Sequence, residues 1–432
     1  MLGLTIPINV SDLIILESLK IFKMLKLLLL DMKKVKARKD EIAGAGNRGV
    51  TGWMEGLERG TLIRGHGRLE SSRTVSVGDR LLEAERIFIN VGARAFVPPV
   101  PGIEEVEVLT NSGMMELDSL PEHLVIVGGS YISLEFAQMY RRFGSQVTVV
   151  EMSDRIIPRE DEDVSQAIRE ILEGEGVVFR RCSQMSRLER REGGFVAHLE
   201  QEGDDAPPLE GSHLLMAVGR RPNTHDLGLD SAGVAVDQRG YITVDGQLQT
   251  NVPGIWAMGD CNGQGAFTHT SYNDFEIVAA NVFDSDPRRV SDRIQCYGLF
   301  VDPPLGRVGM TEREARESGR EVLMGKMPMA RVGRARERSE THGFMKVLVD
   351  AETAEILDAA ILGMNGDEAV HSLLDIHVRP KAVYDNLTIG THSPDRVGVD
   401  SNRITESSPV ELTHHRRDRR HVRLARITFA VS

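Results

Sequence analysis

The stretch HLVIVGGSYISLEFAQMYRRFGSQVTVVE, residues 123–151, constrains the fold more than any other part of this chain. The apolar run 124–127 leads straight into Gly128-Gly129-Ser130, apolar residues then recur at helical spacing, and a second apolar run ends in Glu151. Apolar runs that alternate with a helical pattern are typical of a parallel α/β sheet. The sequence therefore predicts a strand, a tight turn, a helix and a second strand.

The same stretch predicts a dinucleotide site. Glycines at such a turn let backbone amides approach a diphosphate, and the helix N-terminus favours its negative charge. Aligned with G-x-G-x-x-G, the three positions are Gly128, Ser130 and Ser133, and the small serines still permit close approach and packing. Glu151 stands close to the spacing of about 20 residues expected of an acid that binds the ribose hydroxyls. The charge of Glu151 would repel a 2′-phosphate, which favours NADH over NADPH. The alternative is an ordinary strand–helix turn, since such turns also contain glycines.

A second candidate site lies in TNVPGIWAMGDCNG, residues 250–263, where an apolar run ends in Gly259-Asp260. A carboxylate at the end of a buried strand usually faces a ligand, and a ribitol or ribose hydroxyl would suit it. A helix-capping aspartate is the alternative. Such a site needs a glycine-rich phosphate loop, but residues 1–30 hold only Gly3, and GAGNRG at 44–49 follows a charged helical pattern. We therefore expect the missing loop to precede residue 1, in a chain truncated at its N-terminus.

Composition narrows the class of protein. The 432 residues carry a net charge of −12, which argues against nucleic-acid binding, and the basic run 414–426 fits an accidental tail better than a nucleic-acid patch. Charged residues interrupt the apolar stretch 13–30, which favours an amphipathic helix over a membrane span. Three cysteines, with neither a disulfide framework nor metal-ligand spacing, favour a reducing, cytoplasmic setting without a metal site.

The order of patterns predicts several domains. Residues 1–60 have a helical pattern, short β-rich runs follow from Thr61, and a different α+β pattern begins after about Asp286. Strands that alternate with helical patterns predict an α/β fold with parallel sheets, followed by a different, α+β closing domain.

Taken in order, several motifs resemble the class I pyridine nucleotide-disulfide oxidoreductases, in the branch of mercuric reductase and dihydrolipoamide dehydrogenase. They are INVGARAFVPPVPG, VGGSYISLEFAQ with VTVVE, AVGRRPNT, TNVPGIWAMGD and DPPLGRVGMTE, and the resemblance runs from about Asp31 to Ile376. It implies an α/β fold with two Rossmann-like domains, for FAD and NAD(P), of which the FAD domain is incomplete, followed by an α+β interface domain. It also implies the cofactors FAD and NAD, a nicotinamide nucleotide as partner, and a homodimer. The implied domains are 1–120 and 250–285 for FAD, 121–249 for NAD and 286–376 for the interface, with 377–432 an aberrant tail.

The resemblance also implies roles for single residues. Asp260 would bind the FAD ribitol, while Phe267, Thr268 and His269 would begin the helix that approaches the flavin. Gly92 and Gly219 would form the turns that link the FAD and NAD domains. Tyr131 would cover the nicotinamide pocket, unless it is a core tyrosine. Glu135 would lie near the nicotinamide and the flavin N5.

Other parts of the family pattern are missing, so we predict no catalytic residue. The redox motif C-x4-C-x-x-x-K, whose lysine pairs with the glutamate at position 135, is absent because the cysteines lie far apart at 182, 261 and 296. The closing HPTxSE motif is absent too. Shifting the reading frame by one nucleotide within the codon of His377 permits HIHPTVSELIP, so we expect a frameshift.

The expected function is therefore that of a flavin-dependent oxidoreductase, passing hydride from NAD(P)H through FAD to a disulfide, a metal or a small-molecule acceptor. We expect this activity to be impaired in the chain as written. A non-catalytic NAD-binding and dimerisation remnant is the alternative.

Overall fold

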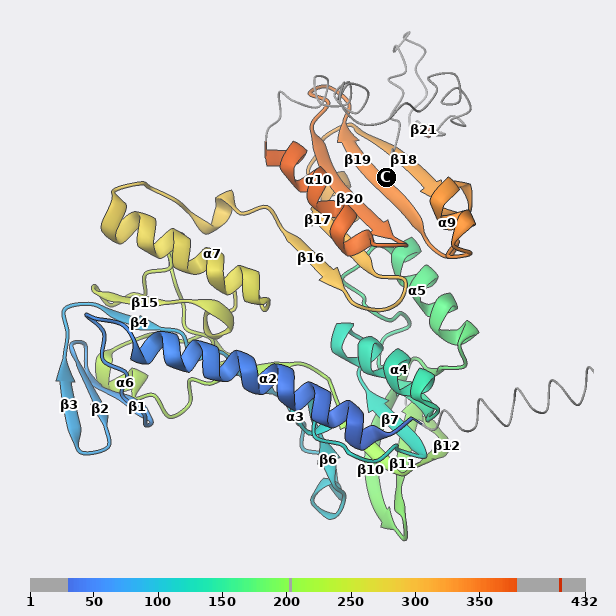
Figure 1. The fold of residues 1–432 in the computed structure, drawn as a ribbon, viewed down its shortest axis with the longest axis horizontal. Helices are drawn as coiled ribbons and strands as arrows, with labels where there is room; N and C mark the ends of the chain where they lie inside the picture. Colours follow the sequence, from blue (N-terminus) through green and yellow to red (C-terminus); the bar gives the residue numbers. More distant parts are fainter. Residues whose placement is uncertain (1–29, 202–203, 379–411, 414–432) are drawn as a thin grey trace, which may run out of the picture. The chain divides into compact units, whose positions relative to one another are not determined.

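The computed structural model describes residues 30–201, 204–378 and 412–413 (Figure 1). These residues form two compact units. The first comprises the described residues up to Leu62 together with Ser112–Pro121, and the second comprises Ile63–Asn111 and the described residues from Glu122 onward. The predicted helix at 13–30 lies, except for Leu30, outside the described residues, and so does almost all of the predicted tail.

The first unit is built on α2 (Met32–Glu55), which Asp31 caps by accepting from the amides of Lys33 and Lys34. Residues 44–49 lie inside this helix, which confirms that GAGNRG is not a strand–helix turn. Met32 is the only residue of α2 that is buried. Lys36 and Lys39 place their ammonium groups 3.0 and 2.7 Å from the carboxylate of Glu116, within the same unit.

The centre of the second unit is a five-stranded parallel sheet of order β6-β13-β7-β8-β9. Its strands are β6 (Val108–Leu109), β13 (His213–Met216), β7 (His123–Val127), β8 (Gln146–Val150) and β9 (Val178–Arg180), with helices α4 (Tyr131–Phe143) and α5 (Glu162–Gly174). The predicted strand, turn, helix and strand at 123–151 are confirmed as β7, α4 and β8. Figure 1 shows α4 beside β7.

One face of the parallel sheet packs against an antiparallel sheet of β10 (Ser183–Arg191), β11 (Gly194–Gln201) and β12 (Asp204–Gly211). Val125 and Val127 of β7 share a buried cluster with Phe195 and Leu199 of β11. Strand residues alternate between the two faces of a sheet, so Leu124 and Ile126, which are fully buried, point to the other face. This two-sided burial explains why β7 has an unbroken apolar sequence.

A second group of strands joins two distant parts of the sequence. The parallel pair is β4 (Ile87–Ile89) and β15 (Ile255–Ala257), and the antiparallel pair is β5 (Ala93–Ala95) and β14 (Arg220–Pro222). A three-stranded sheet of β1 (Gly67–Ser71), β2 (Thr74–Val77) and β3 (Arg80–Glu83) confirms the predicted β-rich runs. Ile89, Leu227, Ile242 and Ile255 lie in one buried cluster, so residues 227–242 pack with this group. Its helices are α6 (Leu229–Ala232), η2 (Gly259–Asn262) and α7 (Thr268–Ala279).

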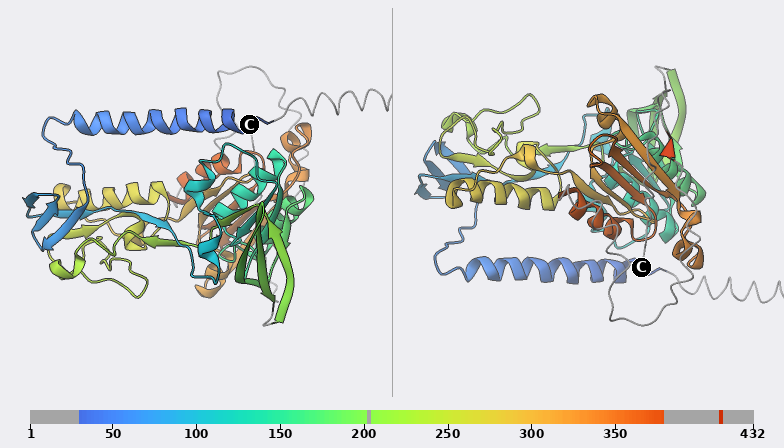
Figure 2. Two further views of the ribbon diagram at one scale, coloured as in Figure 1. Left: turned by 90° about the horizontal axis from the view of Figure 1, so that it is seen from below. Right: turned by 90° about the horizontal axis from the view of Figure 1, so that it is seen from above.

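The third group is an antiparallel sheet of order β16-β17-β20-β19-β18-β21. Its strands are β16 (Cys296–Leu299), β17 (Leu305–Gly309), β18 (Val322–Pro328), β19 (Phe344–Asp350), β20 (Ile356–Leu362) and β21 (Leu412–Thr413). Helix α10 (Gly366–Val378) packs against β17 and β20 (Figures 1 and 2). The α+β pattern predicted after residue 286 is therefore confirmed.

Short elements complete the described chain. They are α3 (Asn111–Met114), α8 (Glu312–Glu317), α9 (Gly333–Glu337), η1 (Ile103–Glu105), η3 (Ala280–Asp284), η4 (Val290–Asp292) and η5 (Met329–Arg331). Within the residues described, no helix is both long enough and apolar enough to cross a membrane.

Candidate functional site

The glycine turn lies at the carboxyl edge of the parallel sheet. The Gly128 amide donates to the Val150 carbonyl of β8 over 2.8 Å. The turn needs glycine here for two reasons: φ is +104°, and a Cβ would lie 2.6 Å from the Ala217 carbonyl oxygen that follows β13. The carboxyl ends of three strands therefore hold the turn where open α/β sheets bind their ligands.

Helix α4 begins directly after the turn. Ser130 is its N-cap, in extended conformation, and no side chain caps the helix there. The N–H groups of a first helical turn have no partner within the helix, so they are available to an anion at this end. Ser133 is fully buried, and its hydroxyl has no hydrogen-bond partner among the described residues. Its role is thus close packing of the helix, at the position where the fingerprint has its third glycine.

Glu151 is fixed beside the turn. One carboxylate oxygen accepts from the Gly129 amide over 2.6 Å, and the other accepts from the Ser153 amide over 2.8 Å. A Cβ at position 129 would lie 2.9 Å from the first of these oxygens. Each carboxylate oxygen can accept more than one hydrogen bond, so both retain capacity for a hydroxyl group.

Four aromatic side chains gather beyond the turn, and we call them the aromatic cluster: Tyr131, Phe267, His269 and Tyr297. Phe267 immediately precedes Thr268, the first residue of α7, and its ring stacks on Tyr297 at 5.5 Å between centroids. The centroid of the Tyr131 ring lies 6.4 Å from that of Phe267. The His269 ring stacks on Phe267 with 5.3 Å between the centroids. The structure therefore brings together residues that the sequence analysis assigned to the nicotinamide side and to the flavin side.

Glu135 lies one turn further along α4. Its carboxylate accepts from the Phe300 amide over 3.0 Å. Burial raises the pKa of this carboxyl, and the Phe300 hydrogen bond offsets only part of the effect. Among the ion pairs of the described residues none involves Glu135, so the lysine partner that the resemblance implies has no substitute there.

Asp260 lies in the first turn of η2 and does not cap it, because the N-cap is Met258. Its carboxylate is 3.1 Å from a guanidinium nitrogen of Arg220, and its side chain is 19% exposed. Gly259 has φ +69°, and a Cβ there would lie 2.6 Å from the Asn90 side chain. The carboxylate is thus fixed at the end of β15 but still accessible, as a ligand for a sugar hydroxyl requires.

Gly92 and Gly219 both adopt left-handed φ values, +67° and +136°, next to the paired strands β5 and β14. Asn223 donates its amide to the Gly92 carbonyl, and Phe96 donates to the Gly219 carbonyl, each over 3.0 Å. These glycines flank one ribbon, which fits their expected place where the chain passes between two domains.

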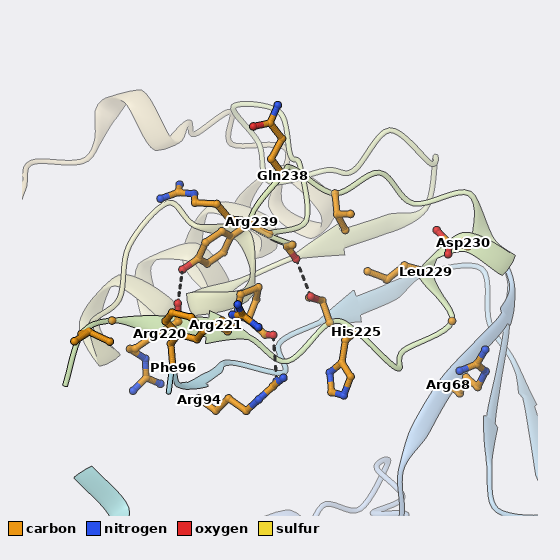
Figure 3. A pocket seen from close by; sticks show the side chains of 18 of the residues that line it. Arg68, Arg94, Phe96, Arg220, Arg221, His225, Leu229, Asp230, Gln238 and Arg239 are labelled. Carbon is orange, nitrogen blue, oxygen red and sulfur yellow. Dashed lines mark hydrogen bonds between the residues drawn. The ribbon is translucent and has the colours of Figure 1, made fainter. Parts of the chain in front are cut away.

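A cavity of about 930 Å³ opens beside this ribbon (Figure 3). Among the described residues of its lining, Asp230 is the only acidic side chain. Six arginines line the cavity as well: Arg68, Arg94, Arg159, Arg220, Arg221 and Arg239. Arg94 donates to the Asn223 side chain over 2.9 Å, and Arg221 lies 4.0 Å from the centre of the Phe96 ring. The sequence analysis missed this cavity, because its arginines come from separate segments and only the pair in GRRPNT was visible.

A buried ionic cluster was also missed. Arg307, 2% exposed, lies 3.4, 3.1 and 3.2 Å from carboxylate oxygens of Glu160, Asp161 and Asp358. Lys346 pairs with Asp161 over 2.8 Å. Burial raises the pKa of Asp358 to about 7, although Arg307 opposes the shift. Burial would also raise the pKa of Asp161, but Arg307 and Lys346 hold it below its usual range.

All three cysteines are free thiols. Cys261 is fully buried and lies 3.2 Å from the Met258 carbonyl oxygen, and burial raises the pKa of both Cys261 and Cys296. A nucleophilic thiol needs the opposite shift. In the described part of the chain, no three metal-ligating side chains lie close enough together to hold an ion.

Comparison with known proteins places this site in a family. Residues 23–274 match the pyridine nucleotide-disulphide oxidoreductases, and residues 297–391 match the dimerisation domain of that family. The second match passes Ile376, where we expected the resemblance to end. That expected end was wrong, because the matched region extends to residue 391.

Individual relatives agree. A probable pyridine nucleotide-disulfide oxidoreductase of Escherichia coli, RclA, is 40% identical over 296 residues, which are 68% of this chain and 66% of the relative. A mercuric reductase of Bacillus cereus is 30% identical over 72% of this chain and 49% of its own length. The structure of the HOCl-induced flavoprotein disulfide reductase RclA superposes with a TM-score of 0.78 at 33% identity, covering 86% of this chain and 84% of that one.

The chain thus spans about half to two thirds of the length of these two curated relatives. Members of this family depend on FAD and use NAD(P)H. The predicted α/β fold, with Rossmann-like domains and a dimerisation domain, is confirmed by the same matches. The chain belongs to the pyridine nucleotide-disulphide oxidoreductase family.

Proposed function

We propose that this chain binds NADH at the turn formed by residues 128–130, within a flavin-dependent oxidoreductase. The observation that carries the proposal is the position of that turn, at the carboxyl ends of β7, β8 and β13 and directly before the uncapped start of α4. The diphosphate would lie on the amides of the turn and of the first helical residues. The carboxylate of Glu151 would accept from the ribose hydroxyls and would repel a 2′-phosphate, which favours NADH over NADPH.

The nicotinamide would extend from the turn toward the aromatic cluster, with Tyr131 covering its pocket and Glu135 beside it. Both residues lie in the first two turns of α4, so one helix would carry the diphosphate site and the nicotinamide site.

The second half of the site fits FAD. Asp260 would accept a hydrogen bond from a ribitol hydroxyl, and the start of α7, at Phe267, Thr268 and His269, would face the ring system. When bound, FAD supplies an acceptor for the hydride of the nicotinamide. Residues 32–55, which include GAGNRG, form helix α2 and therefore supply no glycine loop for the FAD diphosphate. The electron acceptor would be a disulfide, a metal or a small molecule, and the dimerisation domain supports a homodimer.

A specific observation favours a second candidate, a non-catalytic NAD-binding and dimerisation remnant. The chain has three cysteines, all of them free, and no pair of them forms a redox disulfide. Both candidates bind NADH, whereas only the oxidoreductase holds flavin. A purified protein with flavin absorbance supports the first candidate, and a colourless protein that binds NADH supports the second.

The NADH site is tested by the substitution Ser130→Asp. Aspartate is a favourable N-cap residue, so α4 should keep or gain stability. Its charge lies where the diphosphate would bind, and we expect the affinity for NADH to fall by roughly tenfold or more. The measurement is a titration followed by nicotinamide fluorescence, with the free energy of unfolding measured in urea alongside.

The matched control is Thr311→Asp, at the N-cap of α8 in the dimerisation domain, which adds the same charge at a similar helix position. This control should bind NADH as the unmodified chain does. If Ser130→Asp bound NADH with unchanged affinity, the diphosphate would not lie at this turn.

A further inference from the structure

Two tyrosine hydroxyls converge on one buried carboxylate oxygen beside the proposed nicotinamide site. Tyr131 donates to Oε1 of Glu160 over 2.7 Å, and Tyr297 donates to the same oxygen over 2.6 Å. Glu160 is 3% exposed, and the two tyrosine rings lie 5.8 Å apart. Such a pair of charge-assisted bonds fixes both rings more firmly than stacking alone would.

The other side of Glu160 faces the buried ionic cluster. Its Oε2 has no hydrogen-bond partner among the described residues but lies 3.4 Å from the guanidinium of Arg307. Arg307 belongs to β17, whose neighbour β20 supplies Asp358. A carboxylate buried alone would be costly, and the guanidinium offsets that cost. The acceptor for Tyr131 is thus anchored to a sheet rather than to a mobile side chain.

The hydrogen bond between Tyr131 and Glu160 lies beside the proposed NADH site, because of where Tyr131 stands on α4. Tyr131 is the first residue of α4 and directly follows Ser130 of the glycine turn. Its ring centroid lies 6.4 Å from that of Phe267, which directly precedes α7, and the proposed nicotinamide path runs from the turn toward α7. A nicotinamide on this path must displace the ring, and the displaced ring would lose its hydrogen bond to Glu160.

We propose that Glu160 is a positioning residue that holds the Tyr131 ring across the nicotinamide site, so that NADH binding includes breaking the bond between them. The inference rests on the proposed NADH site and adds a residue that sets its affinity. Glu160 touches no cofactor in this scheme and acts only through Tyr131.

ADP-ribose separates this role from a purely structural one, because it carries the diphosphate and both riboses but has no nicotinamide. Tyr131→Phe removes only the hydroxyl. We expect this variant to bind NADH about tenfold more tightly, the loss expected for one hydrogen bond to a charged group, and to bind ADP-ribose with unchanged affinity. Tyr140→Phe, on the same helix, is the matched control and should leave both affinities unchanged. Calorimetric titration measures all of these affinities.

Glu160→Gln keeps the size of the side chain and an acceptor oxygen but removes the charge, so NADH should bind severalfold more tightly. The same change in the Tyr131→Phe background should not alter the ratio of the two affinities any further, because the bond is already absent. An additive effect in the double variant would show a structural role and overturn the proposal.

Two further outcomes would count against it in different ways. If ADP-ribose binds and Tyr131→Phe has the same NADH affinity as the unmodified chain, the positioning role is wrong and the NADH site stands. If neither ligand binds to any variant, the NADH site itself is wrong, and the positioning role fails with it.

Discussion

At the residue scale, burial changes the pKa of one carboxyl in the ionic cluster, that of Asp358. The side chain of Asp358 is fully buried, 3.2 Å from Arg307, and the pKa of Asp358 is raised to about 7. The groups around it are Arg307, Lys346 and the carboxylates of Glu160 and Asp161. Between about pH 4 and pH 7 the folded protein therefore retains a proton that the unfolded chain releases.

The stabilising effect of this proton is complete below the unfolded pKa and is lost as the pH rises through the folded pKa. The unmodified chain should lose up to ~1.4 kcal/mol of unfolding free energy per pH unit in this range relative to Asp358→Asn, which has no proton to lose. Urea unfolding of both proteins at about pH 5 and pH 7 measures the difference. A difference that is the same at both values would show that Asp358 is ionised throughout.

Single residues were predictable from the sequence where a motif marked them. Gly128, Glu151 and Asp260 stand at the ends of apolar runs, and the structure places each at the end of a strand. Their cofactor contacts stay predictions. Glu160 carried no such signal, because its partners Tyr297 and Arg307 lie more than 130 residues away in sequence. The ionic cluster around Glu160 did leave a signal in the sequence. Lys346 in GFMKVLVD and Asp358 in EILDAAILG are charged residues inside apolar strands, and their burial in ion pairs explains this pattern.

At the element scale, Gly46 and Gly49 of helix α2 have space for a side chain, whereas Gly306 of strand β17 has none. Gly46 and Gly49 lie in α2, where an added Cβ would meet nothing within 4 Å, whereas a Cβ at Gly306 in β17 would lie 2.2 Å from the Gly366 carbonyl oxygen at the start of α10. Glycine in the first place costs helix stability, and in the second place it permits close packing.

Gly46→Ala should therefore stabilise α2 by about 0.5–1 kcal/mol, visible as increased helicity by circular dichroism.

Gly306→Ala should destabilise the dimerisation sheet by about 1–3 kcal/mol, visible in urea unfolding. Equal effects of the two substitutions would mean that α10 does not pack on β17 as described.

Elements were predictable where the apolar period was clear, as in β7, α4, β8, β19 and β20. Domain bounds were harder, because they depend on packing between distant segments. We placed the end of the NAD domain at residue 249, which stays a prediction. Leu227 and Ile242 are buried with Ile89 and Ile255, so residues on both sides of 249 share one core.

At the scale of the whole molecule, NADH binding and folding must be linked. A ligand present at about a hundred times its dissociation constant adds about 2.7 kcal/mol to the unfolding free energy of the part that binds it. We expect saturating NADH to raise the midpoint of thermal unfolding by a few degrees, and Ser130→Asp to reduce the rise to about half or less, because a tenfold weaker site adds only about 1.4 kcal/mol at the same NADH concentration. A midpoint that does not respond to NADH in the unmodified chain would contradict the proposed site.

The ionic cluster has one more consequence, a mechanical one. Arg307 of β17 and Lys346 of β19 are both paired in register with Ala360 of β20. Both form ion pairs with Asp161, in the segment that precedes α5. Sliding that segment along the sheet would part opposite charges where no water can screen them. Under a pulling force this joint should hold rigidly and then rupture in a single event, instead of stretching by degrees.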